Sequence, residues 1–94
     1  MLLARFRVAG QSMEPTFHQG DYVLASAVPY WFRKPRVGDV VVVRYRTMLM
    51  VKRIARIERG HFFVRGDNPS GAAVCADALL GKVVMHIWGT RTGI

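Results

Sequence analysis

The sequence predicts an all-β domain, and three of its features lead to this fold class. Its apolar residues gather in short runs rich in valine, isoleucine and aromatic side chains, the residue types that favour strands. Clusters of Gly, Asp, Asn and Pro, which favour turns, separate these runs. Little helix is expected, with residues 77–80 suggesting one helical turn. We therefore expect six or seven short strands, at most one helical turn and a single domain over residues 1–94.

The first predicted strand, Leu3–Val8, alternates apolar and basic side chains, a period of two that is typical of a strand. It leads directly into the loop Gly10–Thr16. Gly20-Asp21 is then expected to form a turn, and Tyr22–Ala25 a short apolar strand.

The segment Val28–Arg36 brackets three consecutive aromatic residues and a basic cluster with two prolines, so neither a regular strand nor a stable helix is expected. Aromatic rings beside cations are typical of a loop at a membrane interface. They are also typical of a loop that covers the core of a small domain, and this second interpretation is favoured.

A second Gly-Asp turn, Val37–Asp39, precedes Val40–Tyr45, whose β-branched residues predict a strand buried on both faces. Arg46-Thr47 is expected to connect it to a longer strand, Leu49–Glu58. The remaining elements are expected as follows: a turn at 58–61, a strand at 62–65, a turn-rich stretch at 66–71, a helical turn at 77–80 ended by Gly81, and a last strand at 82–88.

The formal charge is +8, with eleven arginines and three lysines. This balance suggests an anionic neighbour, but the arginines are scattered and equally fit an ordinary solvated surface. Cys75 is the one cysteine, which excludes an internal disulfide and fits a reducing compartment. No apolar run is long enough for a membrane span or a secretory signal, so we expect a soluble cytoplasmic protein, or at most a peripheral one.

Ser12 lies in a stretch that favours a kinked, accessible loop. Gly10 tolerates backbone angles that other residues resist, and Glu14, which precedes Pro15, is biased away from helix. Such a loop suits a reactive serine, but it equally suits an ordinary turn, so a partner base must decide between them.

Lys52 is the candidate base. On a strand, Met50 and Ile54 flank it on the same face, so its amine projects from an apolar surface. Desolvation there lowers the pKa of the amine, and a neutral amine can accept the proton of a serine hydroxyl. The alternative is a lysine whose amine reaches water from an edge strand.

No histidine offers a convincing alternative base: His18 and His61 lie in expected turns, and His86 is expected to be structural. The histidines and the cysteine have no metal-ligand spacing, and no phosphate-binding glycine loop is present. We therefore expect no metal or cofactor.

Five segments resemble, in order, the sequence boxes of the type I signal peptidases, Ser-Lys proteases on an all-β scaffold. The segments are Gly10–Thr16, Gly20–Val23, Gly38–Val42, Val51–Ile54, and Phe63–Asn68 followed by Gly81–Val83. The resemblance implies that Ser12 is the nucleophile and Lys52 the general base. It also implies an oxyanion site formed by backbone N–H groups near Gly10, a contact of Met13 with substrate, and a structural role for Gly66, Asp67, Asn68 and Asp77.

The chain departs from the family pattern between residues 69 and 79. The family has there a serine that hydrogen-bonds the base lysine, followed after an aspartate by Ser-Arg. Here Cys75 occupies the serine position, and Ala78 and Leu79 replace Ser-Arg. Either Ser70 or Cys75 is left to orient Lys52, and a thiol is the poorer hydrogen-bond partner.

The short chain, which shows neither an amino-terminal anchor nor an inserted second β-domain, is most similar to maturation proteases of nickel-type superoxide dismutase. The resemblance implies a protein substrate with an amino-terminal leader and no nucleic-acid partner. It does not indicate an oligomeric state. Two alternatives stay open. One is a signal peptidase in contact with an anionic membrane, and the other is a non-catalytic binding module on the same fold.

Overall fold

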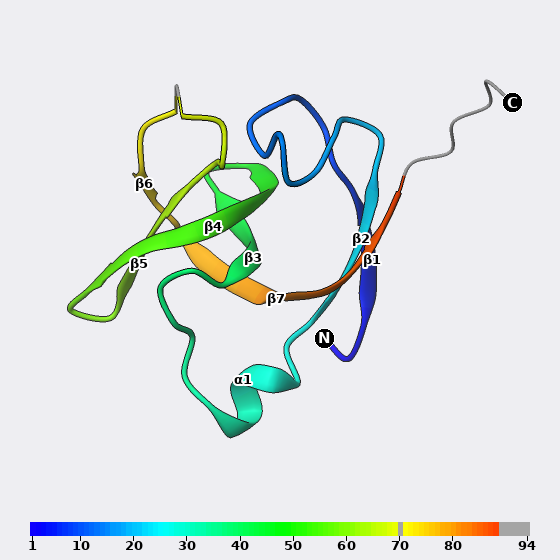
Figure 1. The fold of residues 1–94 in the computed structure, drawn as a ribbon. Helices are drawn as coiled ribbons and strands as arrows, with labels where there is room; N and C mark the ends of the chain where they lie inside the picture. The colour runs from blue at the N-terminus through cyan, green and yellow to red at the C-terminus, as the bar shows by residue number, and fades with distance from the viewer. Residues whose placement is uncertain (70, 89–94) are drawn as a thin grey trace, which may run out of the picture.

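The structure, a computed structural model, describes residues 1–69 and 71–88. Within them, seven antiparallel strands form one sheet in the order β1-β2-β7-β3-β4-β5-β6, with one helical turn, α1 (Figure 1). The strands are β1 (Ala4–Arg7), β2 (Tyr22–Ser26), β3 (Val40–Tyr45), β4 (Met48–Glu58), β5 (His61–Arg65), β6 (Val74–Cys75) and β7 (Ala78–Ile87). The predicted all-β class is confirmed.

Two clusters of buried apolar side chains hold the sheet together. The first packs the end of β1 and the loop after it onto β2, through Val8, Met13, Phe17 and Val23. The second joins β3, β4 and β5 through Val41, Val43, Ile54 and Val64. Consecutive strand residues point to opposite faces, and the three valines at 41–43 are all fully buried. The prediction that β3 is buried on both faces is therefore confirmed.

Both hairpins that contain β4 have two-residue turns. The turn Arg46-Thr47 was expected from the sequence, and Arg46 has a φ of 57°. At the other end, Arg59 and Gly60 have φ values of 50° and 78°, as a tight hairpin turn requires. The sequence predicted His61 in this turn. In the structure His61 pairs with Glu58 and begins β5, so that prediction is wrong.

The prediction of a helical turn at 77–80 is wrong. Residues from Ala78 onward belong to β7, where Ala78 pairs with Arg44 and Leu79 with Val43. Pairing with the buried central strand β3 satisfies the backbone over a long stretch, which a single isolated helical turn cannot do. β6, with two residues, is too short for its sequence to predict.

The aromatic segment differs from expectation in two ways. Residues Pro29–Phe32 form one turn of helix, α1, which the sequence did not predict. Only Tyr30 packs against the second cluster, whereas Trp31 is 62% and Phe32 84% exposed. The favoured interpretation, a loop whose aromatic rings cover the core, is therefore wrong for two of the three rings. Asp39 holds the segment in place, since it accepts hydrogen bonds from the Tyr30 hydroxyl and the Arg33 guanidinium.

Candidate active site

Ser12 lies on a kinked loop between β1 and β2, as the sequence predicts. Gly10, with a φ of 74°, turns the chain at the start of this loop. Met13, only 1% exposed, is buried in the first cluster and anchors the loop directly after Ser12. The N–H of Glu14 donates to the carbonyl of Gln11, which closes the turn around Ser12.

The loop after β5 presses against the backbone of Ser12. The N–H of Asn68 donates to the Ser12 carbonyl oxygen at 2.8 Å. A Cβ atom on Gly66 would lie 2.2 Å from the same oxygen, closer than any side chain permits. Gly66 is therefore required here by close backbone approach, and this contact helps to fix the position of Ser12.

Lys52 lies in the middle of β4, and its Nζ donates a hydrogen bond to Ser12 Oγ at 2.7 Å. Directly opposite on β3 is the fully buried Val41. Ile54 belongs to the second cluster and Met50 packs against it, as the period-two prediction required. Desolvation by these apolar neighbours lowers the pKa of the Lys52 amine. The structure therefore brings the two predicted residues together in apolar surroundings.

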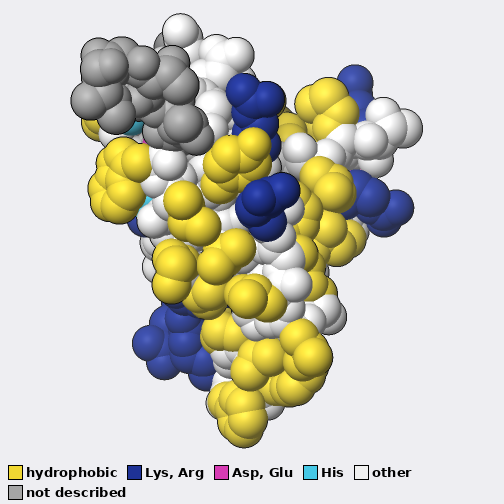
Figure 2. Space-filling model, turned by 90° about the vertical axis from the view of Figure 1, so that its right-hand side faces the viewer, with side chains coloured by type: hydrophobic (Ala, Val, Ile, Leu, Met, Phe, Trp, Pro, Cys, Tyr) yellow, Lys and Arg dark blue, Asp and Glu magenta, His cyan; other side chains and the backbone are white. Residues whose placement is uncertain are grey.

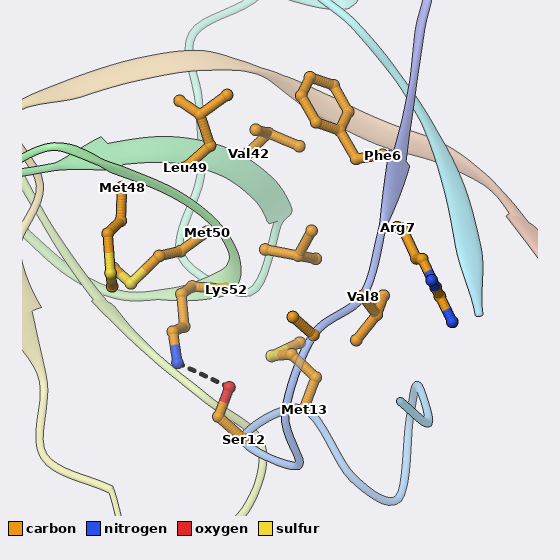
Figure 3. A pocket seen from close by; sticks show the side chains of 12 residues that line it. Phe6, Arg7, Val8, Ser12, Met13, Val42, Met48, Leu49, Met50 and Lys52 are labelled. Atoms are coloured by element: carbon orange, nitrogen blue, oxygen red, sulfur yellow. Dashed lines mark hydrogen bonds between the residues drawn. The ribbon is translucent and has the colours of Figure 1, made fainter. Parts of the chain in front are cut away.

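A cavity of about 500 Å³ opens beside this pair. Figure 3 shows Ser12 and Lys52 at one end of it, with side chains of β1, β3 and β4 along its walls. Most of the lining is apolar, and it includes Phe6, Val8, Met13, Val42, Met48, Leu49, Met50 and Val51. The site thus combines a hydroxyl and an amine with a mainly apolar groove.

A second set of polar contacts lies beside the pair. Arg53, the residue after Lys52, donates to both carboxylate oxygens of Asp67 at 2.8 and 2.9 Å, and the Thr16 hydroxyl donates to the same carboxylate. The sequence indicated a structural role for Asp67 but not these partners. The sequence contained only a weak signal for these contacts. With six acidic residues and eleven arginines in the chain, Asp67 was expected to form an ion pair, but the sequence did not indicate which arginine would be its partner.

The structure does not bring Cys75 to Lys52. Cys75 lies on β6, where it pairs with Phe63, and β5 separates β6 from β4. Its thiol is exposed and donates to the carbonyl of Ala76. The alternative that Cys75 orients Lys52 is therefore wrong, because β6 runs along the far side of β5. Ser70, the other candidate, lies outside the described residues.

Asp77 contacts the β3–β4 hairpin. Its carboxylate accepts a hydrogen bond from the backbone N–H of Arg46, the residue with positive φ in that turn, and its own N–H donates to the Arg44 carbonyl. Asp77 thus supports, through backbone groups, the hairpin that carries one wall of the cavity.

His86 pairs with a residue other than Ser12. His86 Nε2 is 2.8 Å from the buried carboxylate of Asp21, and its ring packs edge-on against Phe17. This agrees with the expected structural role. Among residues 1–69 and 71–88, no group of three or more His, Cys, Asp or Glu side chains is placed to hold a metal ion.

Fold and site together define a class of protein: an all-β domain that presents a serine hydroxyl to a desolvated lysine amine beside an apolar groove. Such an amine, when neutral, can accept the hydroxyl proton and so generate a nucleophile. Residues 1–58 match the family model described as signal peptidase, peptidase S26. The chain belongs to this family.

Curated relatives with similar sequences carry related names. The chain is 42% identical over 77 residues to the probable thylakoidal processing peptidase 2, chloroplastic, of Arabidopsis thaliana, an alignment that covers 82% of the chain and 16% of that protein. It is 42% identical over 43 residues to thylakoidal processing peptidase 1 of the same plant, covering 46% of the chain and 13% of that protein. Against the probable signal peptidase I-1 of Synechocystis sp. it is 40% identical over 57 residues, covering 54% of the chain and 29% of that protein. The chain thus spans less than a third of the length of these relatives.

Proposed function

We propose that the protein is a serine endopeptidase that removes an amino-terminal leader from a protein substrate. Ser12 is the nucleophile and Lys52 the general base. The observation that supports this most directly is the 2.7 Å contact between Lys52 Nζ and Ser12 Oγ in apolar surroundings that lower the pKa of the amine. This distance is within the reach that general-base catalysis requires.

The reaction begins when neutral Lys52 accepts the proton of the Ser12 hydroxyl and Oγ attacks the scissile carbonyl carbon. The carbonyl oxygen becomes an oxyanion, which the N–H of Ser12 stabilises; within the described residues this N–H has no hydrogen-bond acceptor of its own. One such donor contributes roughly 3–4 kcal/mol in comparable acyl transfer. Protonated Lys52 then donates its proton to the leaving amine, and a water molecule, deprotonated by Lys52, hydrolyses the acyl-enzyme.

The substrate binds as an extended strand along the groove. Within the described residues, β1 pairs on one side only, with β2. Residues Met48–Lys52 of β4 there pair with β3 but not with β5, whose pairing begins at Arg53. Both free edges flank the cavity, so a peptide between them gains main-chain hydrogen bonds. Met13 closes the groove next to Ser12, and the family resemblance implies small residues before the cut.

The test uses Ser12→Ala and Lys52→Ala with a leader-bearing substrate. Each variant is expected to lose cleavage by on the order of 10³-fold or more, because nucleophile and base act as one unit. Circular dichroism of both variants shows whether they are folded. Full cleavage by either folded variant contradicts the mechanism. Failure of the wild-type protein to react with a serine-directed acylating probe favours the non-catalytic binding module.

The resemblance at Asn68-Pro69 leads us to propose the leader of a nickel-type superoxide dismutase precursor as the substrate. The relatives named signal peptidase and thylakoidal processing peptidase favour a signal peptide as the competing candidate. Incubation with both precursors, followed by amino-terminal sequencing of the products, distinguishes the two. Cleavage of the signal-peptide precursor alone excludes the nickel-enzyme assignment.

Contact with an anionic membrane is a second proposal, and the exposed aromatic residues favour it. Trp31 and Phe32 project from α1, and Leu2 and Leu3 are 70% and 59% exposed. Figure 2 shows hydrophobic side chains spread over one face of the molecule, with Lys and Arg side chains beside them. Apolar rings flanked by cations suit the headgroup region of an anionic bilayer. Residues 1–69 and 71–88 contain no helix that is long and apolar enough to cross a membrane.

A further inference from the structure

The Asp67 carboxylate connects the two halves of the candidate active site. It accepts hydrogen bonds from Arg53, which follows Lys52 on β4, and from Thr16, four residues after Ser12. Asp67 itself follows Gly66, whose backbone touches Ser12. One side chain, 16% exposed, therefore joins the nucleophile loop, the strand that carries the base and the loop after β5.

Arg53 is held on a second side as well. While Nε and Nη2 donate to Asp67, Nη1 donates to the carbonyl of Gly38 at 2.8 Å. Lys52 and Arg53 are consecutive strand residues, so they point to opposite faces of β4. Fixing the guanidinium therefore fixes the rotation of the strand and, with it, the direction in which Lys52 leaves the backbone.

The charges at this position make Asp67 hard to replace. Arg65 lies directly opposite Arg53 in the β4–β5 register, and like charges in such a pair destabilise it. The contact with Arg53 lowers the pKa of Asp67, so the carboxylate stays ionised and offsets this repulsion. Without it, both guanidinium groups would separate, and β4 and the loop after β5 would move apart beside Ser12.

We propose that Asp67 is the positioning residue that holds Ser12 against Lys52, acting through Thr16 on the nucleophile side and through Arg53 on the base side. This inference rests on the proposed peptidase function. Its physical consequence is that the Asp67 contacts keep the Ser12–Lys52 distance short and so keep Ser12 packed over the amine.

Two substitutions separate the two arms of the contact. Thr16→Val keeps the shape of the side chain and the Arg53–Asp67 ion pair but removes the hydroxyl that links the nucleophile loop to Asp67. Asp67→Asn removes the charge and weakens both arms. Asp39→Asn is the matched control. Asp39 also accepts hydrogen bonds from an arginine and a hydroxyl, those of Arg33 and Tyr30, but these contacts hold α1 in place.

The experiment measures kcat, KM and their pH dependence for the wild type, the three single variants and Thr16→Val/Asp67→Asn. It also follows the Lys52 amine directly by NMR titration. Thr16→Val and Asp67→Asn are expected to lower kcat by about tenfold and up to a hundredfold respectively, with KM within about twofold. The acid limb of the pH profile and the Lys52 titration should both move to higher pH, by about 0.5–1 unit, because water reaches the amine.

The double variant is expected to lose no more activity than Asp67→Asn alone, since both changes break one connected contact. Asp39→Asn should lower the melting temperature yet leave the pH profile and the Lys52 titration in place. The proposal is overturned if Asp67→Asn and Thr16→Val leave the Lys52 titration at its wild-type position. An inactive wild-type protein would instead overturn the proposed function, and the NMR titration would still report on the contact.

Discussion

The α-carbon of Gly66 lies so close to the carbonyl of Ser12 that a Cβ atom on Gly66 would sit 2.2 Å from its oxygen. The chain therefore brings together two backbones that are far apart in sequence, and it does so at the candidate nucleophile. This contact leads to the first prediction.

Gly66→Ala should displace the nucleophile loop, because the added methyl group meets backbone and not the flexible end of a side chain. We expect a loss of kcat of about a hundredfold, as misplacement by about 1 Å can cause. Gly71→Ala is the control, since the nearest atom to its added Cβ is 3.8 Å away. Equal activity of the two variants in a steady-state cleavage assay would contradict the proposed role of Gly66.

Gly10→Ala tests the turn that presents Ser12. Gly10 has a φ of 74°, where an L-residue costs about 1–2 kcal/mol. Gly60, with a φ of 78° in the β4–β5 turn, offers a matched control, and neither glycine has another atom within 4 Å of an added Cβ. Thermal unfolding should show similar losses of stability for Gly10→Ala and Gly60→Ala. Only Gly10→Ala should lower kcat. An equal change in kcat for the two variants would show that strain at Gly10 has no specific effect on Ser12.

The pH dependence follows from the lowered pKa of Lys52. Cleavage should rise with pH as the amine loses its proton, with a midpoint below the ordinary lysine value of 10.5. The unfolded chain binds this proton more tightly than the folded one. The free energy of unfolding of the wild type should therefore increase relative to that of Lys52→Met as the pH rises towards 10.5. Denaturant unfolding at several pH values measures this difference. A constant difference in the free energy of unfolding would show that the amine is not desolvated.

Replacement of Trp31 and Phe32 by serine should weaken binding to vesicles that contain phosphatidylserine. Each ring, when buried in the interface, contributes about 1.5–3 kcal/mol. Ile57→Ser, on the β4–β5 hairpin, is the control because Ile57 is 36% exposed away from α1. Co-sedimentation at low and high salt gives the measurement. If the aromatic double variant binds as well as Ile57→Ser, α1 is not the membrane contact.

Cys75→Ala should cleave at the wild-type rate, because β5 separates β6 from the strand that carries Lys52. Parallel kinetics of Cys75→Ala and the wild type check this. A tenfold or larger loss would restore the thiol as a partner of Lys52.

The sequence by itself was sufficient for the all-β class, most strands and the pairing of Ser12 with Lys52. Strand signals are local: β-branched runs such as 40–45 and turn formers such as Gly38-Asp39 determine structure within a few residues. The two proposed active-site residues were identifiable because each stands in a distinctive short segment, and because the neighbours of Lys52 on a strand are two residues away in sequence.

Tertiary structure decided the rest. Residues 77–80 became strand because β3 offered a partner, and Trp31 and Phe32 became exposed because Tyr30 alone fitted the core. The contacts of Asp67 with Arg53 and Thr16, and that of Gly66 with Ser12, join residues that are 14 to 54 positions apart. Such contacts depend on how strands pair and loops fold back, and no local pattern encodes them. The sequence alone therefore identifies Ser12 and Lys52 as the candidate pair, while only the folded sheet shows what holds the two residues together.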